Sequence, residues 1–142
     1  MSTALNLLAV LVLVLANGFF VAAEFALVSV RRTRIDELVE QGDRLAMQVR
    51  RAHANLDRSI SGTQLGITLA SLGLGWIGEP ALAHLIEDSF AGLPSPWSAI
   101  ATHGTAVAIA FSTITFLHIV LGELAPKSAA LMRPETISRY VA

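Results

Sequence analysis

Three long runs of apolar residues dominate the chain, and polar stretches separate them. The runs cover residues 4–30, 59–78 and 99–124. About 20 apolar residues are enough to cross the hydrocarbon core of a bilayer, so each run predicts a transmembrane helix. Four residues interrupt the first run: Asn17, Gly18, Glu24 and Ser29. The pattern therefore predicts an all-α membrane protein with three spans.

The stretch between the first two runs is polar but periodic. Its apolar residues recur at helical spacing, which predicts one amphipathic helix over 33–57 that lies on the membrane surface or on the bundle. A short amphipathic segment and a loop are expected over 79–98, with Gly92, Pro94, Ser95 and Pro96 as loop residues. A further helix is expected over 134–142. The chain stops just after this helix opens, so we expect a longer polypeptide.

Small residues form a stripe along the second apolar run. They are spaced so that they share one face of a helix: Gly62, Gly66, Ala70 and Gly73. Stripes of small residues let two membrane helices approach closely. We therefore expect this face to pack against another helix.

The charges are sorted along the chain although the formal net charge is only -1. All ten Lys and Arg residues fall in 31–58 and 127–139, and none lies in 79–98. Basic segments stay on the cytoplasmic side of a membrane. We therefore expect a multi-pass protein of the cell membrane with its N-terminus outside and its C-terminus in the cytoplasm.

The composition excludes several classes of function. Hydrophobic residues make up 54% of the chain and the mean hydropathy is +0.61, which is too apolar for an ordinary soluble domain. There is no cysteine, so a metal here must use oxygen or imidazole ligands, which favours hard cations such as Mg²⁺. The sequence has no basic face combined with aromatic residues, so we do not expect nucleic acid as a partner. No hydrolase triad or HExxH motif is present, so we expect no enzyme.

Two carboxylates lie inside the predicted spans, Glu24 and Glu123. An ionisable group at membrane depth costs roughly 2.5–3.5 kcal/mol on insertion scales, so each is a candidate for ion handling. Glu24 has an alternative role, because Arg31 lies seven residues further on and shares its helix face. The two side chains would then simply form an ion pair near the headgroups.

Glu123 has the more informative surroundings. Pro126 has no N–H and cannot bond to the carbonyl of Gly122 four residues earlier. A free carbonyl beside a carboxylate is a pair of ligands for a hard cation. Ser112 lies three helical turns before Glu123 and is expected on the same face. The alternative is a helix that ends at the proline, with Glu123 paired to Lys127.

Other polar groups could join such a site. Ser71, Thr63 and Thr68 carry hydroxyls on the second span, although such hydroxyls often bond to the carbonyl four residues back. Asn17 shares a face with Glu24 and is either part of a polar stripe or a contact between helices. His118 is either a ligand or hydrogen-bonded packing.

Three ordered motifs give the chain a resemblance to a known family. They are the segments NGFFVAAEFALVS at 17–29, TQLGITLAS at 63–71 and GELAPKS at 122–128. Together they resemble the membrane domain of the CNNM/CorC proteins, also called DUF21 or hemolysin-C-like proteins. Many members have serines where this chain has Ala22 and Ala23.

The resemblance implies a dimeric three-helix membrane domain with a juxtamembrane helical belt, followed in longer members by a pair of cytoplasmic CBS domains. It also implies export of Mg²⁺, and of Co²⁺ in some members, coupled to Na⁺. By position, Glu123 would be the acidic ligand and Gly122 part of the same turn, with Ser71, Ser112 and Glu24 as further candidates.

Two functions therefore remain open at this stage. One is a divalent-cation transporter in the lipid bilayer. The other is a membrane anchor and homodimerisation module for a cytoplasmic, nucleotide-sensing CBS region. An anchor needs the small-residue stripe but has no use for a carboxylate at membrane depth.

Overall fold

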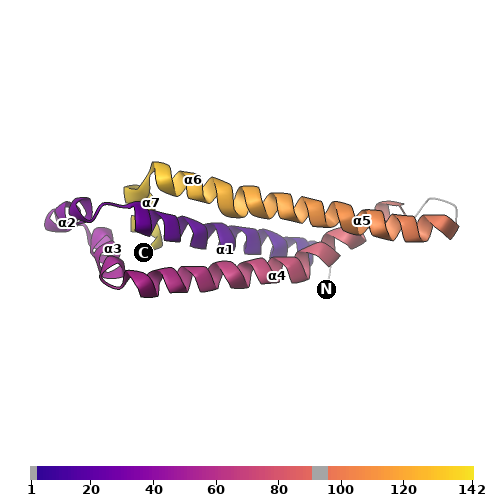
Figure 1. Cartoon of the computed structure of the whole chain (residues 1–142), viewed down its shortest axis with the longest axis horizontal. Coiled ribbons are helices and arrows are strands. Elements are labelled where there is room, and N and C mark those ends of the chain that lie inside the picture. Colours follow the sequence, from indigo (N-terminus) through magenta and orange to yellow (C-terminus); the bar gives the residue numbers. More distant parts are fainter. Residues whose placement is uncertain (1–2, 91–95) are drawn as a thin grey trace.

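The computed structural model describes residues 3–90 and 96–142. All regular structure in these ranges is helical (Figure 1). The elements follow in this order: α1 Thr3–Ser29, α2 Arg32–Glu40, α3 Arg44–Ala54, α4 Leu56–Phe90, α5 Pro96–Leu117, the π-helix η1 His118–Leu124, α6 Ala125–Met132 and α7 Pro134–Val141. The loop predicted at Gly92, Pro94 and Ser95 lies outside the described residues, and Pro96 begins α5 instead.

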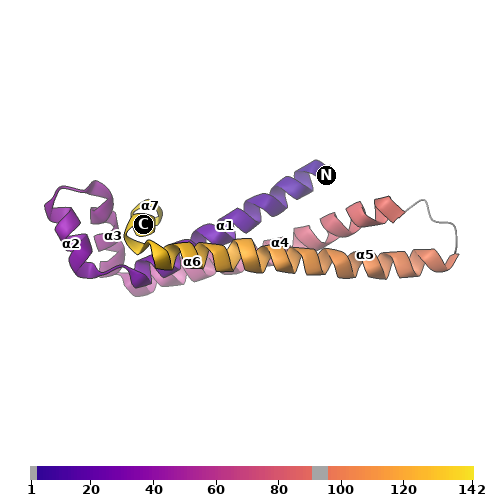
Figure 2. The same cartoon turned by 90° about the horizontal axis from the view of Figure 1, so that it is seen from above.

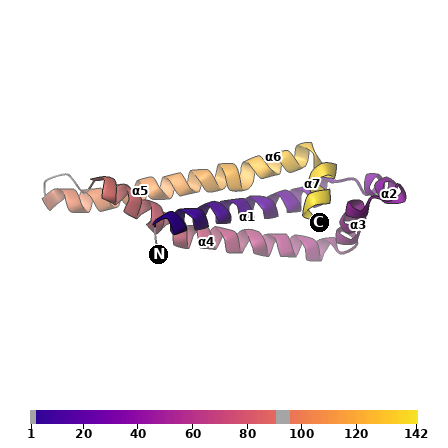
Figure 3. The same ribbon diagram turned by 180° about the vertical axis from the view of Figure 1, so that it is seen from behind.

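Three helical stretches of the described residues are long and apolar enough to cross a membrane. They are Ala4–Ser29, Leu56–Ile86 and His103–Met132, the last running through α5, η1 and α6. Helix α1 packs against α4 and also against η1 and α6, so it lies between the other two spans (Figures 1 and 3). The predicted all-α membrane fold with three spans is confirmed.

The second span differs from its predicted bounds. The sequence suggested an end at 78 and a separate short helix, but α4 continues through Pro80 to Phe90. Pro80 is exposed, and its missing N–H removes only one helical bond. The stretch Leu56–Ile86 has 31 residues, about 46 Å at 1.5 Å per residue. Because the hydrocarbon core is about 30 Å thick, one end of α4 extends beyond it.

The small-residue stripe packs as expected over most of its length. A Cβ on Gly66 would lie 2.6 Å from ring atoms of Phe20, and one on Gly73 would lie 3.2 Å from Leu13. Ala70, between them, is buried. Gly62 meets nothing within 4 Å, so the close contact with α1 begins at Gly66. The absence of side chains at these positions allows α1 and α4 to approach closely.

Two helices replace the single amphipathic helix predicted over 33–57. Helix α2 ends before Gly42, whose φ of +86° suits glycine and stops the helix. Asp43 then caps α3, because its carboxylate accepts hydrogen bonds from the amides of Leu45 and Ala46. The helical spacing of apolar residues persists across the turn, which explains why the sequence pattern suggested one helix.

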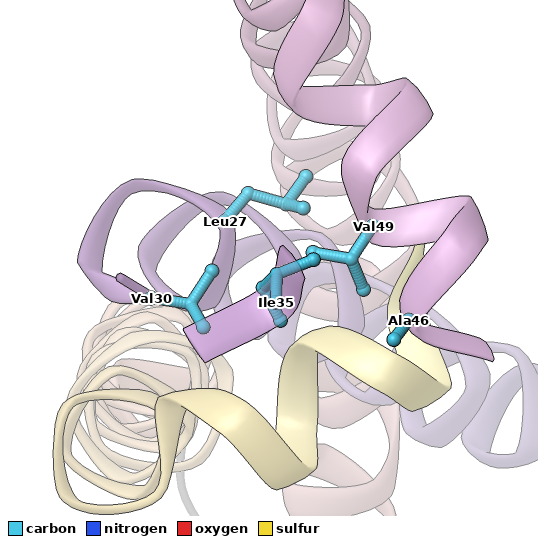
Figure 4. Packing of buried hydrophobic residues seen from close by; sticks show 5 residues of the cluster. All are labelled: Leu27, Val30, Ile35, Ala46 and Val49. Carbon is cyan, nitrogen blue, oxygen red and sulfur yellow. The ribbon is translucent and has the colours of Figure 1, made fainter. Parts of the chain in front are cut away.

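The apolar faces of α2 and α3 close over the end of α1. Leu27 of α1 and Val30, which directly follows that helix, contact Ile35 of α2 and Val49 of α3 in a small cluster that also includes Ala46 (Figure 4). His53 of α3 adds a polar tie, since its Nε2 lies 2.7 Å from the carbonyl oxygen of Leu27. The carbonyls at the end of α1 lack helical partners, so this bond also caps α1.

Ion pairs hold α7 to the same end of the molecule. Arg34 donates to Glu37 at 2.8 Å and to Glu135 of α7 at 3.2 Å. These two carboxylates raise the pKa of Arg34, mainly because its guanidinium donates a hydrogen bond to Glu37. Arg139 of α7 pairs with Asp43 at 2.6 Å. As a result α2, α3 and α7 gather at one end of the bundle (Figures 1 and 2).

Candidate functional site

A π-helix interrupts the third span one turn before Pro126. In η1, His118–Leu124, each backbone hydrogen bond joins residues that are five positions apart. An example is the amide of Ala125, which donates to the carbonyl of Val120. An α-helix would bond the Gly122 carbonyl to residue 126, and a π-helix would bond the Leu121 carbonyl to it. Both bonds fail because residue 126 is proline and has no N–H. The missing N–H of residue 126 therefore leaves one of these two adjacent carbonyls without its backbone donor, whichever of the two patterns holds there.

Both carbonyls lie against α1 where its side chains are small or polar. The Gly122 oxygen accepts a hydrogen bond from Nδ2 of Asn17 at 2.9 Å. A Cβ on Gly18 would lie 3.3 Å from the Leu121 oxygen and 3.0 Å from the Pro126 ring. A Cβ on Gly122 would in turn lie 3.0 Å from Nδ2 of Asn17. Glycine at 18 and 122 is what allows this approach of α1 and η1.

A chain of hydrogen bonds joins all three spans at this level. Ser71 of α4 donates to Oδ1 of Asn17 on α1 at 3.3 Å, and its oxygen lies 3.2 Å from Nε2 of His118 on η1. Asn17 is only 1% exposed. The sequence pattern left open whether Asn17 is a contact between helices, and here it connects the other two spans.

The direction of these hydrogen bonds follows from the groups involved. A carbonyl can only accept, so Asn17 offers its amide nitrogen to Gly122 and keeps its oxygen for Ser71. Ser71 has one hydroxyl proton and gives it to that oxygen. With that proton given to Asn17, the contact with Ser71 is a hydrogen bond in the His118 tautomer that carries its proton on Nε2. In that tautomer the hydrogen bonds run from His118 through Ser71 and Asn17 to the carbonyl of Gly122.

The structure places the five predicted site residues in two groups. Gly122 and Ser71 both belong to this network through Asn17. Glu123 and Ser112 are exposed, and Glu24 is half-buried. Gly122 is buried against α1, whereas Glu123, the next residue of η1, is exposed. The carboxylate of Glu123 is thus next to the network along the chain but on the outer face of its helix.

The expected pairing of Ser112 with Glu123 assumed an unbroken α-helix. The π-helix between them changes the angular step per residue, so a spacing of three α-helical turns no longer fixes a common face. Ser112 instead donates to the carbonyl of Ala108 at 2.8 Å, the local bond that such hydroxyls often make. Thr68 does the same with Gln64 at 2.9 Å.

The alternative ion pairs suggested for the two glutamates do not form in the part of the chain that the structure describes. Lys127 lies over the ring of Phe25, with Nζ 4.5 Å from the centroid, and not against Glu123. No ion pair joins Glu24 to Arg31 within the described ranges. Neither carboxylate is therefore neutralised by the arginine or lysine that its sequence neighbourhood suggested.

The donor set of this region is neutral and rich in oxygen. Among the side chains that the structure describes, in 4–86 and 103–142, no group of three or more His, Asp or Glu gathers in one place. The available atoms are the carbonyls of Leu121 and Gly122, the amide oxygen of Asn17 and the hydroxyl of Ser71. Such oxygens suit hard cations, and a neighbouring carboxylate would have to supply the charge.

Asn17 and His118 are the residues whose position the sequence reasoning did not foresee. Each was considered singly, and neither was predicted beside Ser71 and Gly122. The sequence did indicate that both side chains make hydrogen bonds, because an amide and an imidazole within apolar spans need hydrogen-bond partners. What was missing was the identity of the partner, which depends on how the three helices pack.

Comparison with known proteins gives the family. Residues 7–142 match the Cyclin M transmembrane N-terminal domain, CNNM. The chain belongs to the CNNM family. It is 45% identical over 137 residues to UPF0053 protein YhdT of Bacillus subtilis, covering 96% of this chain and 29% of that protein. It is 42% identical over 140 residues to UPF0053 protein YugS of the same organism, covering 97% of this chain and 32% of that protein.

A similar relative occurs in Mycobacterium tuberculosis. An uncharacterized protein of that organism is 44% identical over 125 residues, which cover 88% of this chain and 34% of the relative. The chain thus spans about a third of the length of these relatives. The matched family is described as a transmembrane domain, and the three spans described above agree with that description.

Proposed function

We propose that this CNNM domain transports a hard divalent cation, with Mg²⁺ as the principal substrate and Co²⁺ as a further one. The observation that carries the proposal is the pair of adjacent carbonyls, Leu121 and Gly122, which lie beside the backbone donor missing at Pro126, at the level of Asn17 and Ser71. Backbone carbonyls that lose a helical donor at membrane depth are tolerated where another polar group of the protein satisfies them, as Asn17 does here for Gly122. All three spans contribute an oxygen to this place.

In this proposal Glu123 supplies the negative charge. A divalent ion in a low-dielectric surrounding needs an anionic ligand, and Glu123 directly follows Gly122. Its side chain is exposed on the outer face of η1, so it must turn toward the carbonyls as an ion enters. Glu24, half-buried on α1, is a second carboxylate available along the route. Ser112 lies on an exposed face and is the weakest of the proposed ligands.

Asn17 must also rearrange. Its Nδ2 now donates to the Gly122 carbonyl, and an N–H group cannot bind a cation. Rotation of the amide would present Oδ1 to the ion beside the two carbonyls. The present hydrogen bonds would then compete with the cation, which sets a threshold for its binding.

One observation favours the alternative role of a membrane anchor. The network of Asn17, Ser71, His118 and Gly122 satisfies its own hydrogen bonds, and polar side chains often join membrane helices in this way. An anchor would hold a homodimer and the cytoplasmic CBS domains of the same polypeptide without moving ions. The two functions differ in one measurable property, the flux of the ion.

The test is Mg²⁺ flux in liposomes that contain the full-length protein. A transporter is expected to move Mg²⁺ into or out of the vesicles well above the rate of protein-free vesicles. If Na⁺ is the coupling ion, as we propose, an opposing Na⁺ gradient should raise that rate and its collapse should lower it. Mg²⁺ flux equal to that of protein-free liposomes, with correctly inserted protein, would leave only the anchor.

We further propose that the end of the bundle with α2, α3 and α7 faces the cytoplasm. All ten Lys and Arg residues lie in the segments 31–58 and 127–139 that form this end, as the positive-inside rule requires. The N-terminus begins α1 at the opposite end and would be outside (Figure 1).

Single cysteines at Gln41 and Ser95 test this orientation, because the chain has no native cysteine. An impermeant thiol reagent added to intact cells should label the cysteine at Ser95 and spare the one at Gln41 until the membrane is opened. Labelling of both cysteines in intact cells would refute the orientation.

A further inference from the structure

Two adjoining cavities lie where the cytoplasm-proximal ends of α1 and α4 meet α2 and α3. One, of about 220 Å³, is lined by residues of α2 and α3 that include Arg32, Arg50 and His53. The other, of about 460 Å³, extends from Arg32 and His53 to the first turn of α4, where Arg58 lies. Both cavities share Arg32 and His53, so arginines of three helices line this pair of adjoining cavities, which together are called the hollow.

The three arginines are not used by the ion pairs that hold this end together. The described ion pairs are Arg34 with Glu37 and Glu135, and Arg139 with Asp43. Within the described residues Arg32, Arg50 and Arg58 take part in none of them. The hollow also contains the carboxylates of Asp36 and Asp57, so three guanidinium groups face two carboxylates, an excess of one positive charge.

The backbone adds to the positive character of the second cavity. Asn55, Leu56 and Asp57 line it at the start of α4, a helix of 35 residues. The first amides of a helix have no helical partner and carry partial positive charge. The wall opposite is fixed, because the hydrogen bond from His53 to Leu27 ties α3 to the end of α1. The hollow is therefore preformed by the fold.

The hollow also lies next to the ends of two membrane spans, which places it near the surface of the bilayer. The apolar stretch of α1 ends at Ser29 and that of α4 begins at Leu56, so both spans leave the hydrocarbon core here. Lipid phosphates lie just outside that core. Every basic residue in 31–58 is arginine and none is lysine. The planar guanidinium group matches phosphate oxygens in pairs, which an ammonium group cannot do.

From this arrangement we propose that the hollow formed by Arg32, Arg50, His53 and Arg58 is a binding site for a phosphate group. Its position at the end of two spans makes the headgroup of an anionic phospholipid of the same leaflet the expected source, in preference to a soluble phosphate. A bound headgroup would link α2, α3 and α4 and would thereby fasten the juxtamembrane helices to the bundle. The site lies apart from Gly122 and Glu123 and requires no transported ion.

The test uses the full-length protein in detergent micelles without Mg²⁺. The midpoint of thermal unfolding is titrated with phosphatidylglycerol, with phosphatidylcholine, and with inorganic phosphate at constant ionic strength. The variant is Arg32→Gln/Arg50→Gln. The matched control is Arg44→Gln/Arg51→Gln, which removes the same charge from exposed positions of α3 that line neither cavity.

Phosphatidylglycerol should raise the midpoint at lower concentrations than phosphatidylcholine does. In the cavity variant its apparent affinity should fall about thirtyfold, roughly fivefold for each guanidinium removed, while the control stays near wild type. Stabilisation by inorganic phosphate with the same dependence on Arg32 and Arg50 would support the site and make its source soluble. If the double variant unfolds at the outset, Arg58→Gln replaces it. The proposal would be overturned if the cavity variant and the control lost the same amount of affinity for phosphatidylglycerol. It would also be overturned if the wild-type protein showed no preference for phosphatidylglycerol over phosphatidylcholine and no response to inorganic phosphate.

Discussion

Replacing Glu123 with glutamine is expected to remove most of the binding of Mg²⁺ while leaving the fold intact. The substitution keeps the size of the side chain and removes the negative charge that directly follows Gly122 in the chain. At one hundred times its Kd, Mg²⁺ stabilises the wild-type protein by about 2.7 kcal/mol. If the affinity falls about a hundredfold, the same Mg²⁺ concentration stabilises the variant by only about 0.4 kcal/mol.

The measurement is the Mg²⁺-dependent shift of the unfolding midpoint at matched ionic strength. Glu40→Gln is the matched control, because Glu40 is an exposed carboxylate at the end of α2, far along the chain from η1. The control should respond to Mg²⁺ like wild type. If Glu123 only stabilises its helix end, its replacement should cost at most about 1 kcal/mol and leave the Mg²⁺ response unchanged. That result would exclude Glu123 from the cation site.

Replacing Asn17 with leucine is expected to lower both the stability and the Mg²⁺ response. Leucine is similar in size but cannot donate to the Gly122 carbonyl or accept from Ser71. Pro126 offers no N–H in its place. A buried carbonyl that loses its partner costs about 1–3 kcal/mol, so the free energy of unfolding should fall by that amount. The Mg²⁺ response should also fall, since the amide oxygen is a proposed ligand.

The two effects of Asn17→Leu separate the transporter from the anchor. A residue that only joins helices should lower the stability and leave the Mg²⁺ response of the folded protein intact. Thr68→Val is a suitable control, because it removes a hydroxyl from α4 that bonds only to its own helix at Gln64. Thr68→Val should change neither quantity. An Asn17→Leu protein with wild-type stability and wild-type Mg²⁺ response would contradict both roles for Asn17.

Local pattern was sufficient for most of the architecture. Apolar runs long enough to cross a bilayer give the spans directly, because their length and hydropathy are properties of the chain alone. The close packing at Gly66 and Gly73 could also be predicted, because glycine at helical spacing serves one evident purpose in a membrane helix. The gathering of all basic residues at one end follows from their positions before and after the spans.

The helix ends were less predictable. The turn at Gly42 was missed because apolar residues keep the same spacing on both sides of it, so the periodicity does not record the break. The continuation of α4 past Pro80 was missed because the proline suggested a helix end that does not occur. Proline usually ends a helix, but here the lost bond is at an exposed position where other groups can satisfy the carbonyl.

For the candidate site, the sequence alone determined the chemistry and the tertiary structure decided the arrangement. The residues GELAP at 122–126 already specify a carboxylate, a carbonyl without its helical partner and the proline that causes this. The sequence could not specify the π-helix, because a five-residue bond pattern is adopted only where packing against α1 compensates for its weaker geometry. It could not pair Asn17 with Gly122 either, since 105 residues separate them and only the packing of α1 against η1 brings them together. That same packing turns Gly122 inward and Glu123 outward.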